Sequence, residues 1–118
     1  MISRTIKSNS KPVLLCLLLL LTLSSHLIAQ EKGKIIGKVV DSKSGETLIG
    51  VNVVIQNTTK GTATDIDGKY TLSNLEPGTY SVVFTYVSYT KKIVEGVEVK
   101  PGETTKIDVS LSSDTEML

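Results

Sequence analysis

The feature that most constrains the fold is an alternation of apolar and polar residues with a period of two, which runs through residues 34–112. It is clearest in 104–112, where Ile107, Val109 and Leu111 are separated by polar residues. Successive side chains of a β-strand point to opposite faces, so this pattern indicates strands with one buried face. The helical spacing of 3.6 residues is almost absent, and we therefore expect an all-β fold.

Seven such runs are separated by turn signals. Asp67-Gly68 favours a two-residue hairpin, and the Pro-Gly pairs at 77–78 and 101–102 favour turns in which glycine adopts a positive φ. Short strands separated by frequent turns are typical of a β-sandwich. We therefore expect a seven-stranded antiparallel β-sandwich. The expected strands are 34–41, 51–57, 61–65, 70–73, 79–87, 92–100 and 104–112.

The run at 79–87 has the strongest strand pattern of the seven, and we expect it to form the centre of the core. In 92–100, the apolar spacing of Ile93 and Val97 is interrupted by Gly96, which predicts a β-bulge. A chain of 118 residues has room for one small domain and one core of this kind. The apolar face of the strong strand carries Tyr80, Val82, Phe84 and Tyr86.

The first 29 residues differ from the rest and fit a secretory signal peptide. A basic segment ends at Lys11, an apolar stretch covers 13–23, and a short polar stretch ends at Ala29. We predict cleavage between Ala29 and Gln30, and hence export. The alternative is an uncleaved membrane anchor, although a spanning helix needs about 20 apolar residues.

Beyond residue 29 the chain has no Cys, His or Trp, and its 10 Lys face 12 acidic residues. Without Cys and His it can form no disulfide, no thiolate or imidazole metal site, and no Ser-His or Cys-His nucleophile. The near balance of charge gives no electrostatic footprint for nucleic acid. We therefore expect a non-enzymatic domain with no catalytic residue, no cofactor and no nucleic-acid partner.

Asp65 and Asp67 form an Asp-x-Asp-Gly pattern that also occurs in calcium loops. Placing them at loop positions 3 and 5 puts Ala63 at position 1 and Asn74 at position 12, so two required ligands are missing. The favoured interpretation is a hairpin turn held by Asp side-chain hydrogen bonds to its own backbone. The two residues stay only weak candidates for a metal site.

Tyr86 and Tyr89 are the candidate contacts for a ligand or partner. They lie near the end of the strong strand, where aromatic rings can stack on a sugar if they are exposed together. Tyr70 and Tyr80 are expected to cover the core instead, with their hydroxyls at its edge.

Five motifs in a fixed order resemble a carboxypeptidase-regulatory-like domain. The resemblance spans residues 34–112 and implies a transthyretin-like, seven-stranded Greek-key sandwich that is the non-catalytic partner in peptidases. In the last motif, Ser88 replaces the usual glycine. The motifs are Ile36-Gly37-Lys38-Val39-Val40-Asp41, Gly45 to Val53, Gly61 to Tyr70, Leu75-Glu76-Pro77-Gly78-Thr79-Tyr80, and Val87-Ser88-Tyr89.

The order of segments resembles the amino terminus of TonB-dependent outer-membrane receptors of the glycan-importing kind. We expect a signal peptide at 1–29, the sandwich at 30–112 and the start of an acidic linker at 113–118. The resemblance implies a periplasmic position at the outer membrane, and other receptor domains or accessory proteins as partners. The chain is then either part of a receptor or a free-standing module. The alternative function is a stand-alone periplasmic or surface module that binds a glycan or peptide.

Overall fold

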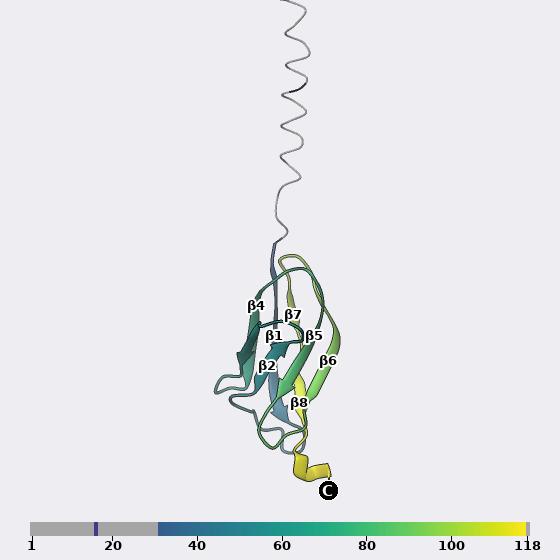
Figure 1. The fold of residues 1–118 in the computed structure, drawn as a ribbon. Helices are drawn as coiled ribbons and strands as arrows, with labels where there is room; N and C mark the ends of the chain where they lie inside the picture. The colour runs from purple at the N-terminus through teal and green to yellow at the C-terminus, as the bar shows by residue number, and fades with distance from the viewer. Residues whose placement is uncertain (1–15, 17–30, 118) are drawn as a thin grey trace, which may run out of the picture.

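The computed structural model describes Cys16 and residues 31–117, and the latter form two β-sheets packed face to face (Figure 1). The expected all-β sandwich is confirmed. The predicted signal peptide, residues 1–29, lies outside the described residues except for Cys16. Within the described part of the chain, no helix is long and apolar enough to cross a membrane. The elements are β1 (Gly33–Asp41), β2 (Asn52–Ile55), β3 (Gly61–Ala63), β4 (Lys69–Leu75), β5 (Gly78–Thr85), β6 (Lys92–Val99), β7 (Thr104–Lys106), β8 (Val109–Leu111) and the 3-10 helix η2 (Asp114–Met117).

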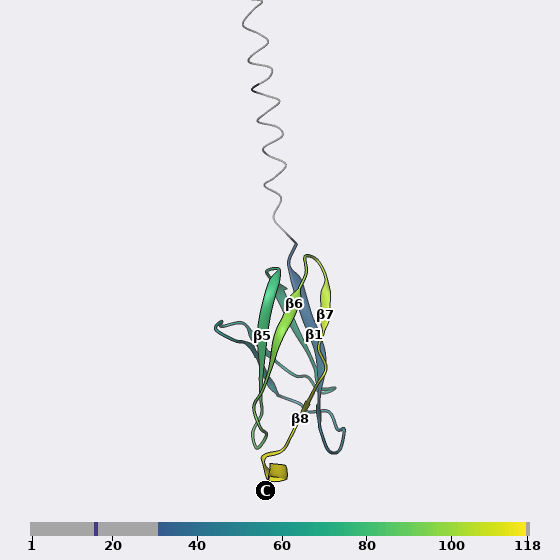
Figure 2. The same cartoon turned by 90° about the vertical axis from the view of Figure 1, so that its right-hand side faces the viewer.

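Each sheet contains four strands. One has the order β4-β1-β7, with β8 pairing with the second half of β1, and the other has the order β3-β2-β5-β6. Figure 2 shows the two layers from the side, with β5 in one and β1 and β7 in the other. The chain crosses between the sheets several times, so residues distant in sequence meet at each end of the sandwich.

The last expected strand is divided into β7 and β8, so the sandwich has eight strands rather than seven. The break lies at Ile107 and Asp108. The Ile107 backbone N–H donates to the Ile36 carbonyl at 2.8 Å, and the Asp108 carboxylate accepts from the Lys38 backbone N–H at 3.0 Å. A side-chain oxygen thus takes the place of a backbone acceptor, which interrupts the ladder.

The expectation of a wholly antiparallel sandwich is wrong at β1. This strand pairs antiparallel with β4 but parallel with both β7 and β8. The cause is the preceding strand: β6 belongs to the other sheet and ends where β1 begins. The crossover therefore delivers β7 to the start of β1, and the two strands run in the same direction.

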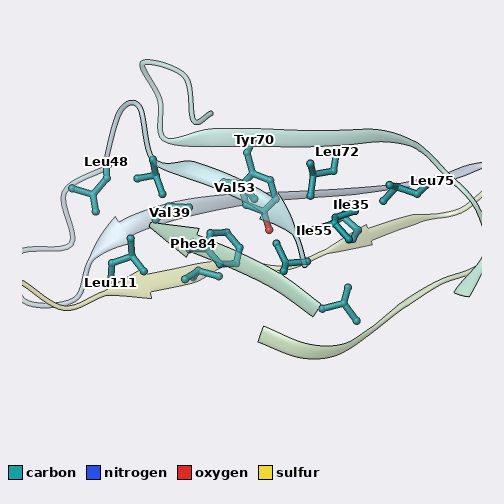
Figure 3. Packing of buried hydrophobic residues seen from close by; sticks show 14 of the residues in the cluster. Ile35, Val39, Leu48, Val53, Ile55, Tyr70, Leu72, Leu75, Phe84 and Leu111 are labelled. Carbon is teal, nitrogen blue, oxygen red and sulfur yellow. The ribbon is translucent and has the colours of Figure 1, made fainter. Parts of the chain in front are cut away.

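The core fills the space between the sheets and is almost entirely aliphatic. Phe84 is its largest fully buried side chain, and its ring meets that of Tyr70 edge to face with centroids 5.5 Å apart (Figure 3). The Tyr70 hydroxyl donates to the Ile107 carbonyl, and the Tyr80 hydroxyl donates to the Glu76 carbonyl, each at 2.5 Å. The expectation that these two tyrosines cover the core with their hydroxyls at its edge is confirmed.

The expected bulge at Gly96 is present, and it changes which residues of β6 face the core. The register with β5 shifts between Tyr80 and Val82, and Gly96 has a φ of 69°. The bulge moves the alternation by one residue, so Val94 packs against the core while Ile93 faces outward and is 40% exposed. Ile93 therefore does not share the buried face of Val97.

Candidate functional site

Three loops and the carboxyl-terminal segment gather at one end of the sandwich, which we call the loop end (Figure 1). Strands β1, β3, β5 and β8 all finish there, because their directions in the two sheets coincide. All four residues singled out from the sequence, Asp65, Asp67, Tyr86 and Tyr89, lie in these loops. The loop end consists of residues 42–51, 64–68, 86–91 and 112–117.

Tyr86 and Tyr89 contact each other in the loop that follows β5. Their ring centroids are 5.4 Å apart with an angle of 46° between the planes, and both rings are half-buried against the core. The Tyr89 backbone N–H donates to the Tyr86 carbonyl at 3.1 Å, which closes the turn. The two rings are therefore tilted toward each other rather than presented side by side as a flat platform.

Asp41 is the polar centre of this cluster. Its Oδ2 accepts a hydrogen bond from the Tyr89 hydroxyl at 2.6 Å, and its Oδ1 accepts from the backbone N–H groups of Lys43 and Ser44, each at 2.9 Å. The Tyr89 hydroxyl, followed by the Ser44 and Lys43 amides, lowers the pKa of Asp41 from 3.8 to about 2. One carboxylate thus fastens the loop after β1 to the loop after β5.

We expect Tyr89→Phe to raise the pKa of Asp41 from about 2 toward its ordinary value of 3.8, because the largest cause of the lowering is lost. With a folded-state pKa below the unfolded one, ionised Asp41 stabilises the fold above pH 3.8, and this contribution disappears as the pH falls through about 2. The variant should therefore lose part of its acid dependence of unfolding in that window.

An NMR titration of the Asp41 carboxyl carbon measures this pKa directly. Tyr86→Phe is the matched control, because it removes a hydroxyl from the same cluster and leaves the Tyr89 bond in place. The control should keep the pKa of Asp41 at about 2. An equal pKa in both variants would contradict the assigned role of Tyr89.

The carboxyl-terminal segment is fastened to the same loop. The Thr90 backbone N–H donates to the Ser112 carbonyl at 2.9 Å, and the Asp114 N–H donates to the Ser88 carbonyl at 2.9 Å. Tyr89 forms an isolated bridge with Ser113. Ser88 has a φ of 67°, a conformation that glycine adopts most readily. The direction in which the chain leaves the sandwich is therefore fixed by the loop after β5.

Asp65 and Asp67 lie in the turn before β4. Asp65 Oδ1 accepts hydrogen bonds from the backbone N–H groups of Asp67 and Lys69, each at 2.9 Å, and its carbonyl accepts from Gly68 N–H at 2.9 Å. Gly68 has a φ of 74°, the positive value that the Asp-Gly pair predicts. The expected two-residue hairpin is wrong, because β3 and β4, which flank this turn, lie in different sheets and do not pair with each other. The structure thus gives the Asp65 side chain an organising role in the turn, while the Asp67 side chain is exposed.

We expect Asp65→Ala to lower the free energy of unfolding by about 1–2 kcal/mol, because two backbone donors lose their acceptor. Asp67→Ala is the control from the same turn and should change stability by less than about 0.5 kcal/mol. Urea unfolding followed by circular dichroism measures both. Equal losses of unfolding free energy in the two variants would contradict the turn assignment. So would a rise of the parent's urea midpoint in the presence of calcium that is absent from both variants.

Thr64 is a structural residue of the loop end that the sequence did not single out. It is the one buried polar side chain of the described residues, 4% exposed. Its hydroxyl donates to the Leu48 carbonyl at 2.5 Å and accepts from the Val51 N–H at 2.9 Å. These bonds fix the loop after β1 to the start of the loop before β4. Their partners are 16 and 13 residues away, so no local motif marks them.

Each loop at this end exposes one large aliphatic side chain. Ile49 is 52% exposed, Ile66 is 76% exposed and Val87 is 85% exposed. Beside Val87 and Tyr86 the surface is hollowed into an open depression of about 390 Å³, which Gly50, Asn52 and Thr85 also line. Exposed aliphatic groups on a rigid frame suit contact with another protein surface.

Metal binding and proton transfer each place requirements on the titratable side chains of the loop end. Within residues 31–117 no three His, Cys, Asp or Glu side chains gather where they could hold a metal ion. Asp41, the one carboxyl in the described part of the chain with a strongly perturbed pKa, is held ionised by three hydrogen-bond donors. A general acid or base needs a pKa near the working pH, and Asp41 is far from it.

The sequence is similar to one domain family and to several TonB-dependent receptors. The family model described as CarboxypepD_reg-like domain matches residues 35–118. TonB-dependent receptor P3 of Formosa agariphila is 33% identical over 116 residues, which are 97% of this chain and 11% of the receptor. TonB-dependent receptor SusC of Bacteroides thetaiotaomicron is 34% identical over 112 residues, 90% of this chain and 10% of the receptor. The chain thus spans about a tenth of these curated relatives.

Solved structures with similar folds come from several kinds of protein. A cohesin-X-dockerin complex of Acetivibrio cellulolyticus matches with a TM-score of 0.57 and 23% identity, over 65% of this chain and 52% of that one. The pilus 2b backbone protein of group B streptococcus matches with a TM-score of 0.54 and 20% identity, over 72% and 42% of the two chains. At these identities the likeness concerns the fold alone.

Proposed function

The chain belongs to the CarboxypepD_reg-like domain family, and we propose that it serves as the amino-terminal accessory domain of a TonB-dependent receptor. In this proposal the domain is exported, lies on the periplasmic side of the outer membrane and performs no catalysis. The receptor that carries it imports a glycan. The domain acts by contact with the rest of the receptor and its accessory proteins.

One observation carries the proposal. The identity to receptor P3 extends over 97% of this chain while covering 11% of that receptor. High coverage of the short chain with low coverage of the long one is expected when a single domain is compared with a large receptor that contains its counterpart. The apolar stretch at 13–23, which fits an export signal, supports a position outside the cytoplasm.

The loop end supplies the contact surface that such a domain requires. Ile49, Ile66 and Val87 project from three loops that hydrogen bonds hold together, and the carboxyl-terminal segment leaves from the same end. A polypeptide that continued from this segment would start beside these side chains. We therefore assign the loop end to the contact between this domain and the following parts of the receptor.

The absence of catalysis rests on the chemistry of the exported part. Residues 30–118 contain no Cys or His, and the carboxylates at the loop end hold turns together. The stand-alone module that binds a glycan or peptide is the rival function. It requires free aromatic faces, whereas Tyr86 and Tyr89 are half-buried and packed against each other.

Protease accessibility in cells of the source organism tests the proposed position. An antibody raised against residues 31–117 should detect the domain in the outer-membrane fraction, protected from added protease in intact cells. Permeabilising the outer membrane should expose it to digestion. Digestion in intact cells would contradict the periplasmic assignment, and recovery in the soluble fraction alone would contradict membership of a receptor.

A further inference from the structure

The outward face of the sheet β4-β1-β7 carries a cluster of lysines that we call the basic face. Lys34 and Lys38 lie on β1, Lys69 on β4 and Lys106 on β7, and all four are exposed. On each strand they alternate with residues that face the core, so they share one side of the sheet. The cluster surrounds Ile36, which is the register partner of Lys106.

The charge of this face contrasts with that of the chain. Residues 30–118 contain 12 acidic residues and 10 lysines. Asp108 is the one acidic residue on the basic face, and its carboxylate lies 3.7 Å from the Lys106 ammonium and accepts from the Lys38 backbone. Within residues 31–117, the ammonium groups of Lys34, Lys38 and Lys69 form no ion pair with a carboxylate within 4 Å. The fold has thus gathered unneutralised positive charge on one side of a net acidic domain.

Two of these lysines lie in an unfavourable arrangement. Lys38 and Lys69 are direct partners in the antiparallel register of β1 and β4. Like charges placed directly opposite each other across two strands destabilise the pair. An anionic group bound between them would remove this repulsion. The arrangement is therefore better suited to a bound state than to the free domain.

The surface between the lysines is hollowed and aliphatic. A depression of about 340 Å³ lies over Ile36 and Thr71, and its lining includes three lysines and one carboxylate, those of Lys38, Lys69, Lys106 and Asp108. The Tyr70 ring lies beneath the sheet, packed against Phe84 in the core. The face thus combines cations at its rim with an aliphatic floor.

We propose that the basic face binds an extended acidic segment of a partner protein, with an aliphatic side chain seated over Ile36. Charge complementarity identifies the partner's sign, since four lysines face outward against one aspartate. In an extended peptide, side chains on one side recur about every 7 Å. Acidic residues two positions before and two positions after one aliphatic residue share its side of the peptide. They can therefore reach lysines on adjacent strands of the sheet, which are about 5 Å apart.

An acidic peptide fits this face better than an anionic glycan. Sugar rings gain from stacking on exposed aromatic faces, and the depression offers none, because the Tyr70 ring is turned into the core against Phe84. An aliphatic side chain gains from burial against Ile36, which is half-buried at the centre of the lysines. The basic face is a surface of the sheet, distinct from the loop end, so this proposal does not rest on the receptor assignment.

Titration of the purified protein with a short peptide of the pattern Glu-Ser-Leu-Ser-Glu tests the proposal, because its two Glu and its Leu lie on one side when the peptide is extended. Lys34→Glu/Lys69→Glu should weaken the affinity about tenfold or more, because two attractive contacts become repulsive. Lys43→Glu/Lys91→Glu is the matched control, since it makes the same change of net charge at exposed loop positions and should bind nearly as the parent does. The parent's affinity should also fall as the ionic strength rises from about 0.01 M to 0.15 M.

Two further measurements separate the explanations. Lys69→Glu places opposite charges across the β1–β4 register, so its thermal midpoint should equal or exceed the parent's, which excludes unfolding as the cause of lost binding. Ile36→Ser should weaken the binding of the peptide but not the binding of a heparin oligosaccharide. No peptide binding at low salt would overturn the proposal, as would equal losses in both charge variants. Binding of heparin alone would assign the face to an anionic glycan instead.

Discussion

Phe84→Ala should lower the free energy of unfolding by about 3–5 kcal/mol, the cost usual for a fully buried phenylalanine. Phe84 is 0% exposed, lies on β5 opposite Val53, and packs edge to face on Tyr70 (Figure 3). Its removal leaves a cavity between the sheets and forfeits the aromatic contact, worth about 1 kcal/mol. Small domains are stable by only about 5–15 kcal/mol, so the variant loses a large share of that stability.

Guanidinium unfolding followed by circular dichroism measures this loss. Val83→Ala is the matched control, because Val83 is the neighbouring residue of the same strand and its side chain points away from the core. It should cost about 1 kcal/mol or less. A loss below about 1 kcal/mol for Phe84→Ala would contradict the strand register on which the two-sheet core depends.

Gly37→Ala should have a comparable effect for the opposite reason, overcrowding. A Cβ at position 37 would lie 1.8 Å from the Ile107 carbonyl oxygen and 2.7 Å from the Tyr70 hydroxyl. Those two groups are joined by a hydrogen bond of 2.5 Å that ties β4 to the segment between β7 and β8. A methyl group must push this segment away and break the bond. We expect a loss of about 3 kcal/mol or more.

Gly78→Ala is the control for this substitution. Gly78 begins β5, a Cβ there would meet no atom within 4 Å, and its φ lies outside the left-handed region. The control should stay within about 0.5 kcal/mol of the parent in the same unfolding measurement. Similar free energies of unfolding for Gly37→Ala and Gly78→Ala would mean that β1 and the Ile107 segment are not in the close contact described.

Local chemistry explains why much of the fold could be predicted from the sequence. The alternation of β1, the turn at Asp67-Gly68 and the bulge at Gly96 each depend on residues within a few positions of one another. The outward turn of Ile93 could not be predicted, because a bulge shifts every residue on one side of it. The division of the last strand depends on Asp108 reaching the Lys38 amide, 70 residues away in sequence.

In the candidate site, too, contacts between residues close in sequence could be predicted and contacts between distant residues could not. Tyr86 and Tyr89 could be placed together because only two residues separate them, and their rings do meet. Their link to Asp41 spans 48 residues, and only the tertiary structure reveals it. The basic face has the same origin, since its lysines come from three strands that are distant in sequence. A single sequence has no local signal for such groupings.

The central claim is that this sandwich is one domain of a TonB-dependent receptor, and the mass of the native polypeptide tests it most directly. Outer membranes of the source organism can be probed with an antibody against residues 31–117, and the detected band identified by peptide mapping. We expect a membrane polypeptide far larger than 12.7 kDa that contains receptor sequence, because the curated relatives are about ten times longer than the matched region. A native polypeptide of 12.7 kDa or less, with no receptor sequence attached, would contradict it.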